Sequence, residues 1–228
     1  MAQALRNCGR DIVFAACNWG VKESRDWMRS HGADTYRSTY DISDNPESFI
    51  KIFRSQCFKM ENNTAGCYND MDMLTVGMFG NGNVANGGCT ADEYDMEFAM
   101  WAFLGVPLII GGDIRNMDER SRKLLQHEGL IAINQDIECR PAFPVSGDDR
   151  LVFCKLLSDG TFALLFINGD EQQRMLSCIT HDIGYTVGSG YKIHMRDILS
   201  GEEMIQGDFP VVTVPGRDCR IFKCKLVK

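Results

Sequence analysis

Short apolar runs alternate with helix-like segments over the first 135 residues, and this alternation restricts the fold more than any other feature. The apolar runs predict four strands, at residues 12–17, 33–40, 66–74 and 107–111. Helical patterns separate them, so each helix carries the chain back to start the next strand in the same direction. Repeated βα units of this kind predict a parallel sheet covered by helices.

The number of units predicts how much of a barrel is present. A helix over residues 2–7 comes before the first strand, and four βα units follow it. Parallel βα units of this type close into a barrel when there are eight of them. We therefore expect residues 1–140 to form half of a TIM (β/α)8 barrel.

The helices of this half carry recognisable start and stop signals. After the second strand, Phe49, Ile52 and Phe53 recur on one helical face, and Asp44 or Asn45 can cap the first turn. A helix over residues 91–105 begins with a sequence typical of a capping box, from Thr90 to Glu93. A last helix, at about residues 118–128, is expected to stop at Gly129.

Beyond Pro141 the pattern changes to alternating apolar and polar residues separated by tight turns. Residues 150–157 and 161–168 predict a hairpin around Ser158-Asp159-Gly160. Further strands are expected near residues 192–197, 211–215 and 220–227. The predicted fold is therefore α/β followed by all-β: a partial barrel over 1–140 and an antiparallel β-sandwich domain over 141–228.

Composition excludes several classes of partner. The chain has 24 basic and 31 acidic residues, a net charge of -7, and its basic residues are scattered, which argues against nucleic-acid binding. The longest apolar stretch, residues 98–112, is shorter than the roughly 20 residues of a membrane span. The first residues do not resemble a secretory signal, so we expect a cytoplasmic protein.

Metal and cofactor sites are not expected. The ten cysteines lie at irregular spacings with no C-x-x-C pair, and the chain has only four histidines. Most of the cysteines are therefore interpreted as buried thiols in a reducing compartment. We predict no metal site and no cofactor.

Polar clusters lie on or directly after the predicted parallel strands, and barrel enzymes place their active sites at the carboxyl ends of such strands. Carboxylates accept hydrogen bonds from sugar hydroxyls, arginine donates them, and a tryptophan face stacks on C–H surfaces. A hydroxyl-rich ligand, such as a carbohydrate, fits this set best. The clusters are Asn18-Trp19-Gly20, residues 37–41, residues 69–73 and residues 113–115.

Five segments that include these clusters follow one another in a characteristic order. They are residues 17–20 (CNWG), 36–42 (YRSTYDI), 68–74 (YNDMDML), 107–115 (PLIIGGDIR) and 131–136 (IAINQD). Together they resemble glycoside hydrolase family 27, the family of α-galactosidases and α-N-acetylgalactosaminidases. The resemblance covers residues 1 to about 140, with a looser match in the final strands, and it implies units five to eight of the barrel.

The resemblance implies a retaining glycosidase with two catalytic carboxylates. Asp41 matches the general acid/base, and Arg37 matches a substrate-binding arginine four residues earlier. A general acid must hold its proton near neutral pH, which burial or a neighbouring carboxylate favours. An arginine placed too close to Asp41 would oppose this.

The same resemblance assigns the sugar-binding residues. Asp72 and Met73 match a sugar-contacting pair, although Met71 stands where the family usually has proline. Asn18 matches the position next to the 2-substituent of the sugar, which leaves the choice between galactose and N-acetylgalactosamine open. Trp19 is expected either to contact substrate or to pack in the core.

The nucleophile that the resemblance implies belongs to a strand before this chain begins. Because one carboxylate cannot perform both steps of a retaining reaction, we expect the chain to be inactive alone, or nearly so. One alternative is a non-catalytic sugar-binding or assembly module that pairs with a copy of itself or with a separate N-terminal half. Another is an inverting glycosidase that uses Asp41 and Asp72.

Overall fold

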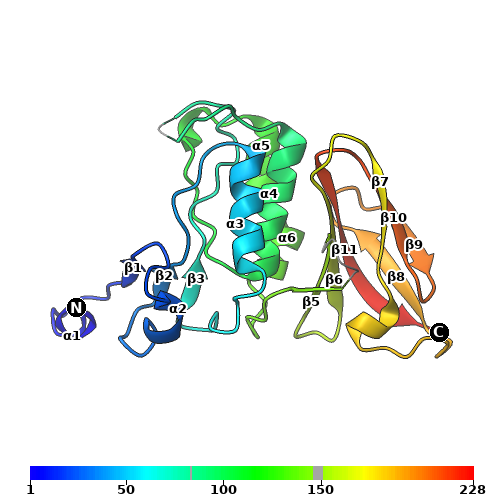
Figure 1. The fold of residues 1–228 in the computed structure, drawn as a ribbon, viewed down its shortest axis with the longest axis horizontal. Helices are drawn as coiled ribbons and strands as arrows, with labels where there is room; N and C mark the ends of the chain where they lie inside the picture. Colours follow the sequence, from blue (N-terminus) through cyan, green and yellow to red (C-terminus); the bar gives the residue numbers. More distant parts are fainter. Residues whose placement is uncertain (83, 146–150) are drawn as a thin grey trace.

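The computed structural model describes residues 1–82, 84–145 and 151–228. Three regions follow one another along its longest axis: a small parallel sheet, a group of helices and an antiparallel β region (Figure 1). The termini lie at opposite ends of this arrangement. Within the described ranges, no helix is long and apolar enough to cross a membrane.

The parallel sheet contains three strands in the order β1-β2-β3, which are Ala15–Cys17, Thr35–Arg37 and Tyr68–Asp70. The predicted parallel pairing is confirmed, but the strands are shorter than the apolar runs. The predicted fourth strand is reduced to a single parallel bridge between Leu74 and Ile110. No further strand hydrogen-bonds to its outer edge among the described residues, and Ile110 remains 46% exposed.

The predicted helices after β2 and β3 are confirmed with their capping residues. In α3, Pro46–Gln56, the Asn45 side chain accepts a hydrogen bond from the backbone N–H of Ser48 at 2.8 Å. In α4, Ala91–Leu104, Thr90 and Glu93 form a capping box. The first two helices are α1, Ala2–Arg6, and α2, Ser24–Trp27, and short 3-10 helices occur at Ile114–Asn116 and Thr180–Ile183.

The prediction that one helix ends at Gly129 was wrong. Two helices occur here, α5 at Glu119–Leu125 and α6 at Glu128–Asn134, and Gly129 lies in the first turn of α6. A Cβ atom at this position would lie 2.9 Å from Cγ2 of Ile198, a residue of the antiparallel region. The glycine therefore allows α6 to approach that region closely, instead of ending a helix.

The antiparallel region contains a six-stranded sheet in the order β4-β5-β6-β11-β8-β9 and a two-stranded sheet, β10-β7. The β5–β6 hairpin and the predicted strands β8, β10 and β11 are confirmed; Arg150 lies outside the described residues. Two edge strands, β7 and β9, are not among the predicted strands. Both are short and largely exposed, and their sequences show little of the alternation of apolar and polar residues that predicts a strand. The strands are β4 Phe143–Pro144, β5 Val152–Leu156, β6 Phe162–Asn168, β7 Arg174–Ser177, β8 Lys192–Asp197, β9 Glu203–Gln206, β10 Val211–Val214 and β11 Asp218–Val227.

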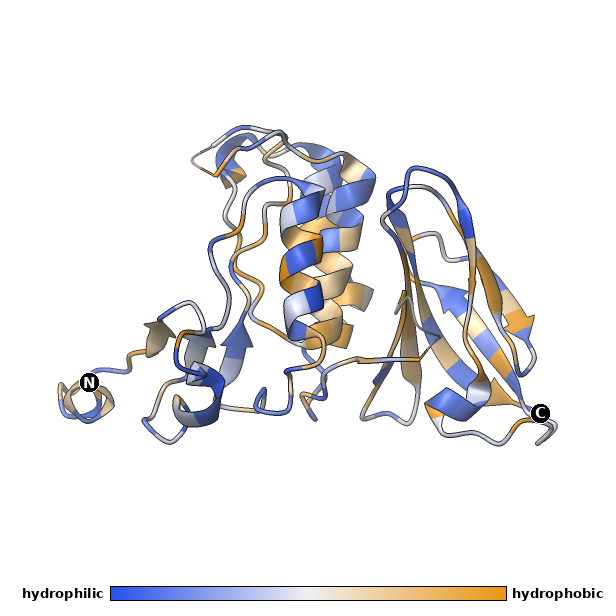
Figure 2. Cartoon of the chain, in the orientation of Figure 1, coloured by the Kyte–Doolittle hydropathy of each residue, from blue (hydrophilic) through white to orange (hydrophobic). Residues whose placement is uncertain are grey.

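Helix α4 lies at the centre of the main hydrophobic core. Eleven of its fourteen residues are buried, and the same core includes Phe53 of α3, Leu130 of α6 and Ile221 of β11. Apolar residues are accordingly frequent in the helices between the parallel sheet and the antiparallel region (Figure 2). A second core lies between the two antiparallel sheets, where residues such as Leu176 and Phe222 meet.

The cysteines follow the predicted burial for the most part. Seven of the ten are buried, whereas Cys8 and Cys17 are exposed and Cys139 is partly exposed.

Candidate functional site

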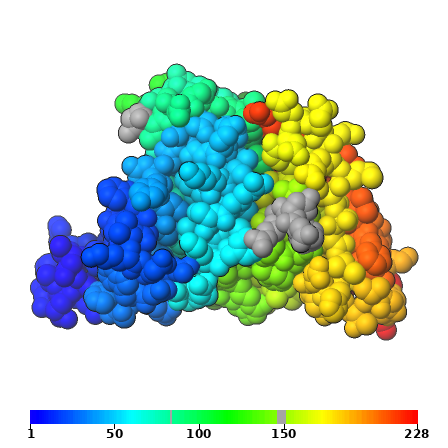
Figure 3. Space-filling view, in the orientation of Figure 1, coloured from blue at the N-terminus to red at the C-terminus, as the bar shows by residue number. Residues whose placement is uncertain are grey.

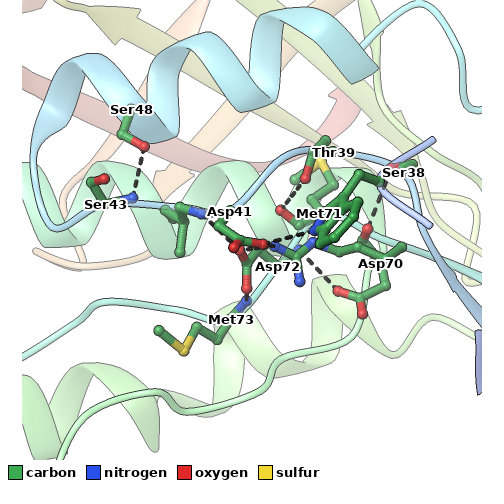
Figure 4. A network of polar contacts seen from close by, with 12 residues as sticks. Ser38, Thr39, Asp41, Ser43, Ser48, Asp70, Met71, Asp72 and Met73 are labelled. Carbon is green, nitrogen blue, oxygen red and sulfur yellow. Dashed lines mark hydrogen bonds and ion pairs between the residues drawn. The ribbon is translucent and has the colours of Figure 1, made fainter. Parts of the chain in front are cut away.

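Four of the six predicted site residues meet at the carboxyl ends of the parallel strands. Arg37 is the last residue of β2, Asp72 follows β3, and Trp19 follows β1, while Asp41 lies on the loop after β2. Asp41 and Asp72 belong to one network of polar contacts (Figure 4). The parallel register pairs Arg37 with Asp70, and this alignment brings the loops after β2 and β3 together.

The guanidinium group of Arg37 joins the two carboxylates. Its Nη2 donates a hydrogen bond to Oδ1 of Asp41 at 2.9 Å and another to Oδ2 of Asp72. The Arg37 side chain is only 13% exposed, so solvent screens these contacts weakly. A single cation therefore fixes the relative position of the two acidic groups.

Asp72 is a buried and fully engaged anion. Besides Arg37, its carboxylate accepts hydrogen bonds from the backbone N–H of Ile42 and of Met73, both at 2.7 Å. Its backbone N–H donates to Oδ1 of Asp70 at 2.9 Å, and burial raises the pKa of Asp70. These contacts hold Asp72 in a left-handed conformation, with φ of 102°, that is uncommon for a residue other than glycine.

Asp41 has a different environment, because its side chain is 74% exposed. Its Oδ1 accepts hydrogen bonds from Arg37 and from the indole Nε1 of Trp19, the latter at 3.0 Å. Trp19 and Gly20 both have positive φ, and a Cβ atom on Gly20 would lie 2.4 Å from the carbonyl oxygen of Ser38. A tight backbone approach thus places the indole beside the carboxylate.

Two predicted site residues are not part of this group of charges. Met73 packs against Gly111, where any side chain would overlap its sulfur atom, and it contacts the main core. Asn18 folds back into its own loop and donates from Nδ2 to the carbonyl of Val21 at 2.9 Å. The remaining predicted cluster stays apart as well, since Asp113 pairs with Arg115 on the exposed surface.

Two buried residues of α4 support the site, and the sequence analysis missed both. Trp101 donates from Nε1 to the carbonyl oxygen of Asp72 at 2.9 Å. Glu97, one turn earlier, accepts hydrogen bonds from the backbone N–H and the hydroxyl of Thr75. Burial raises the pKa of Glu97 to about 8. The available signal was a carboxylate and an indole spaced i, i+4 in the otherwise apolar second half of this helix.

The arrangement combines one exposed carboxylate with a buried cation and a buried anion. Such a set can bind hydroxyl groups through Arg37 and Asp72 and can exchange a proton at Asp41. No group of acidic, histidine or cysteine side chains suited to a metal ion occurs in the part of the chain that the structure describes.

Comparison with known proteins identifies the family of this chain. The family model for "Alpha galactosidase A" matches residues 1–136. An α-galactosidase of Cyamopsis tetragonoloba is 31% identical over 97% of this chain and 52% of its own length. Alpha-galactosidase 2 of Arabidopsis thaliana is 39% identical over 60% of this chain and 32% of its own length.

A solved structure shares the fold. Alpha-galactosidase I of Mortierella vinacea superposes with a TM-score of 0.85 at 24% identity, over 98% of this chain and 61% of the other. The chain spans about half the length of curated relatives that it matches nearly throughout. The chain belongs to glycoside hydrolase family 27, the α-galactosidase family.

Proposed function

We propose that this chain supplies the acid/base side of a retaining α-galactosidase site, with Asp41 as the general acid/base. The observation that carries the proposal is the pair of contacts from Arg37, which binds the exposed carboxylate of Asp41 and the buried carboxylate of Asp72. One exposed and one immobilised acid beside a cation suit proton transfer next to a bound sugar.

In the proposed reaction, Asp41 donates its proton to the glycosidic oxygen as the bond from that oxygen to the anomeric carbon breaks. A carboxylate on polypeptide outside this chain attacks the anomeric carbon and forms the galactosyl intermediate. Asp41 then takes a proton from the water that hydrolyses this intermediate.

Asp72 is better suited to binding than to nucleophilic attack. Both of its carboxylate oxygens already accept hydrogen bonds, and its side chain is only 10% exposed. Two oxygens bound to one Arg37 nitrogen lie within about 6 Å of each other, since each hydrogen bond is about 3 Å long. An inverting pair requires about 6.5–9.5 Å, so this geometry opposes an inverting reaction by Asp41 and Asp72.

We further propose that residues 1–140 are units five to eight of a TIM barrel, followed by a β-sandwich domain over 141–228. The three-stranded parallel sheet with its outer helices supports the first assignment, and two antiparallel sheets around one core support the second. We also propose that the protein is cytoplasmic and that it prefers galactose over N-acetylgalactosamine.

Two measurements on the purified chain test the proposal. In an NMR titration, methyl α-galactoside should bind weakly, and Asp72→Asn should abolish binding, whereas the surface control Asp113→Asn should not. The chain alone should not hydrolyse a nitrophenyl α-galactoside at a measurable rate. Rapid hydrolysis that is lost in Asp41→Asn, or a complete absence of galactoside binding, would contradict the proposal.

A second candidate function, assembly with another polypeptide, is favoured by exposed apolar residues at the two outer edges of the parallel region. Val13 is 72% exposed before β1, and Ile109 and Ile110 are 50% and 46% exposed beside β3. Unpaired strand edges with apolar side chains favour association. Light scattering that shows only a compact monomer, with or without a separately produced N-terminal half, would exclude this function.

A further inference from the structure

A groove with a volume of ≈420 Å³ begins at Asp41 and runs along α3. The loop after β1 contributes Trp19, and the loop after β2 contributes Tyr40 and Asp41. Lys51 of α3 and Lys59, which follows the end of that helix, line the groove together with small polar side chains. In the space-filling view, the blue surface of the N-terminal segment adjoins the lighter blue surface of the segment that includes α3 (Figure 3).

The charge of this groove is unusual for an acidic chain. Lys51 and Ser55 lie one turn apart on α3, and Lys59 follows three residues after the helix ends at Gln56. Both lysines are exposed, and neither forms an ion pair within the described ranges. Asp41 is the only carboxylate among the described residues that line the groove. An anion bound here would therefore meet two unpaired ammonium groups.

Aromatic side chains border the end of the groove nearest to Asp41. Trp19 is 48% exposed and Tyr40 is 73% exposed. The hydrogen bond from the Trp19 indole to Asp41 fixes this ring beside the carboxylate and leaves much of its surface open. Exposed aromatic faces of this kind stack on the C–H surfaces of a sugar ring.

We propose that this groove binds the leaving group of the α-galactoside, and that the preferred leaving group is a saccharide carrying a carboxylate, a uronic acid. The inference rests on the proposed function: a general acid donates to the oxygen that joins the galactosyl unit to its leaving group, so the leaving group must lie next to Asp41. Trp19 and Tyr40 border the sugar ring, and Lys51 and Lys59 attract its carboxylate.

The test compares three ligands in NMR titrations of the full chain at low ionic strength: methyl α-galactoside, α-galactosyl glucose and α-galactosyl glucuronic acid. We expect the acidic disaccharide to bind roughly fivefold more tightly than the neutral one, as two surface ion pairs would give. This preference should fall at high salt. The double variant Lys51→Ala/Lys59→Ala should remove the preference and leave the affinity for methyl α-galactoside unchanged.

A charge-matched control, Lys192→Ala/Lys225→Ala, changes two exposed lysines of the antiparallel region and should keep the preference. Equal affinity of the wild-type chain for the acidic and neutral disaccharides would overturn the inference and leave the proposed function standing. An equal loss of affinity for all three ligands in the Lys51/Lys59 variant would also overturn it. If none of the three binds, the proposed function itself fails and the inference fails with it.

Discussion

The buried carboxyl group of Glu97 should make the stability of the chain depend on pH. Glu97 is completely buried in α4 and accepts hydrogen bonds from Thr75, next to the loop that carries Asp72. Burial raises its pKa from 4.5 to about 8. In the pH range between these values, the folded chain holds a proton at Glu97 that the unfolded chain releases. Stability is therefore lost as the pH rises through this range.

The size of the effect follows from the same numbers. Each pH unit in which only the folded state holds the proton costs about 1.4 kcal/mol, which gives about 5 kcal/mol at most over the whole range. Burial also raises the pKa of Asp218 to about 6, so the contribution of Asp218 to the pH dependence of stability ends near that pH. Between pH 6.5 and 8, Glu97 should dominate and lower the free energy of unfolding by about 2 kcal/mol.

Urea unfolding across pH 6.5–8 measures this loss. Glu97→Gln keeps a carbonyl oxygen that can accept from the N–H of Thr75 but has no proton to lose, so its free energy of unfolding should stay nearly constant. The control Glu128→Gln changes an exposed glutamate of α6 and should retain the wild-type slope. A Glu97→Gln variant with the wild-type slope would refute the reasoning.

Three further perturbations test the local structure by urea unfolding. Gly20→Ala should lower the free energy of unfolding by about 2–3 kcal/mol, because φ is +75° and the new Cβ atom meets a backbone oxygen at 2.4 Å. The control Gly160→Ala, where φ is +78° and the new Cβ atom meets open space, should lower it by about 1 kcal/mol. Equal losses in the two variants would contradict this reasoning. Burial lowers the pKa of Lys155 to about 8, so the free energy of unfolding of the wild-type chain relative to that of Lys155→Met should rise by up to about 3 kcal/mol between pH 8 and 10.5. Trp101→Phe should lower the free energy of unfolding by about 1–3 kcal/mol and weaken galactoside binding, because it leaves the buried carbonyl of Asp72 without its hydrogen-bond donor. Unchanged binding would show that Trp101 does not support the site.

Local sequence patterns predicted the part of the site that lies at the carboxyl ends of the parallel strands. Arg37 and Asp72 lie within the second and third predicted strands and Asp41 directly follows the second, and parallel strands bring their ends to one edge, so their meeting could be expected from the sequence. The capped starts of α3 and α4 were equally predictable, since the signals at Asn45 and Thr90 are local.

Features that depend on distant neighbours could not be predicted. Gly129 has the form of a helix stop, but close contact with Ile198, far along the chain, explains its role inside α6. The strand expected at 107–111 depended on continuous pairing with a neighbouring strand, and among the described residues it forms a single bridge, between Ile110 and Leu74. Asn18 lies at the rim by sequence, yet its amide satisfies the carbonyl of Val21 in the same loop.

The position of α4 explains why the site and the antiparallel region should be stable together. One face of this helix presents Trp101 and Glu97 to the loop that carries Asp72, while Phe98 and Phe103 belong to the same core as Ile221 of β11. The helix is buried on nearly all sides, so removing either neighbour exposes apolar surface that nothing else covers. The antiparallel region therefore acts on the proposed chemistry indirectly, by holding the helix that fixes the buried carboxylate in place.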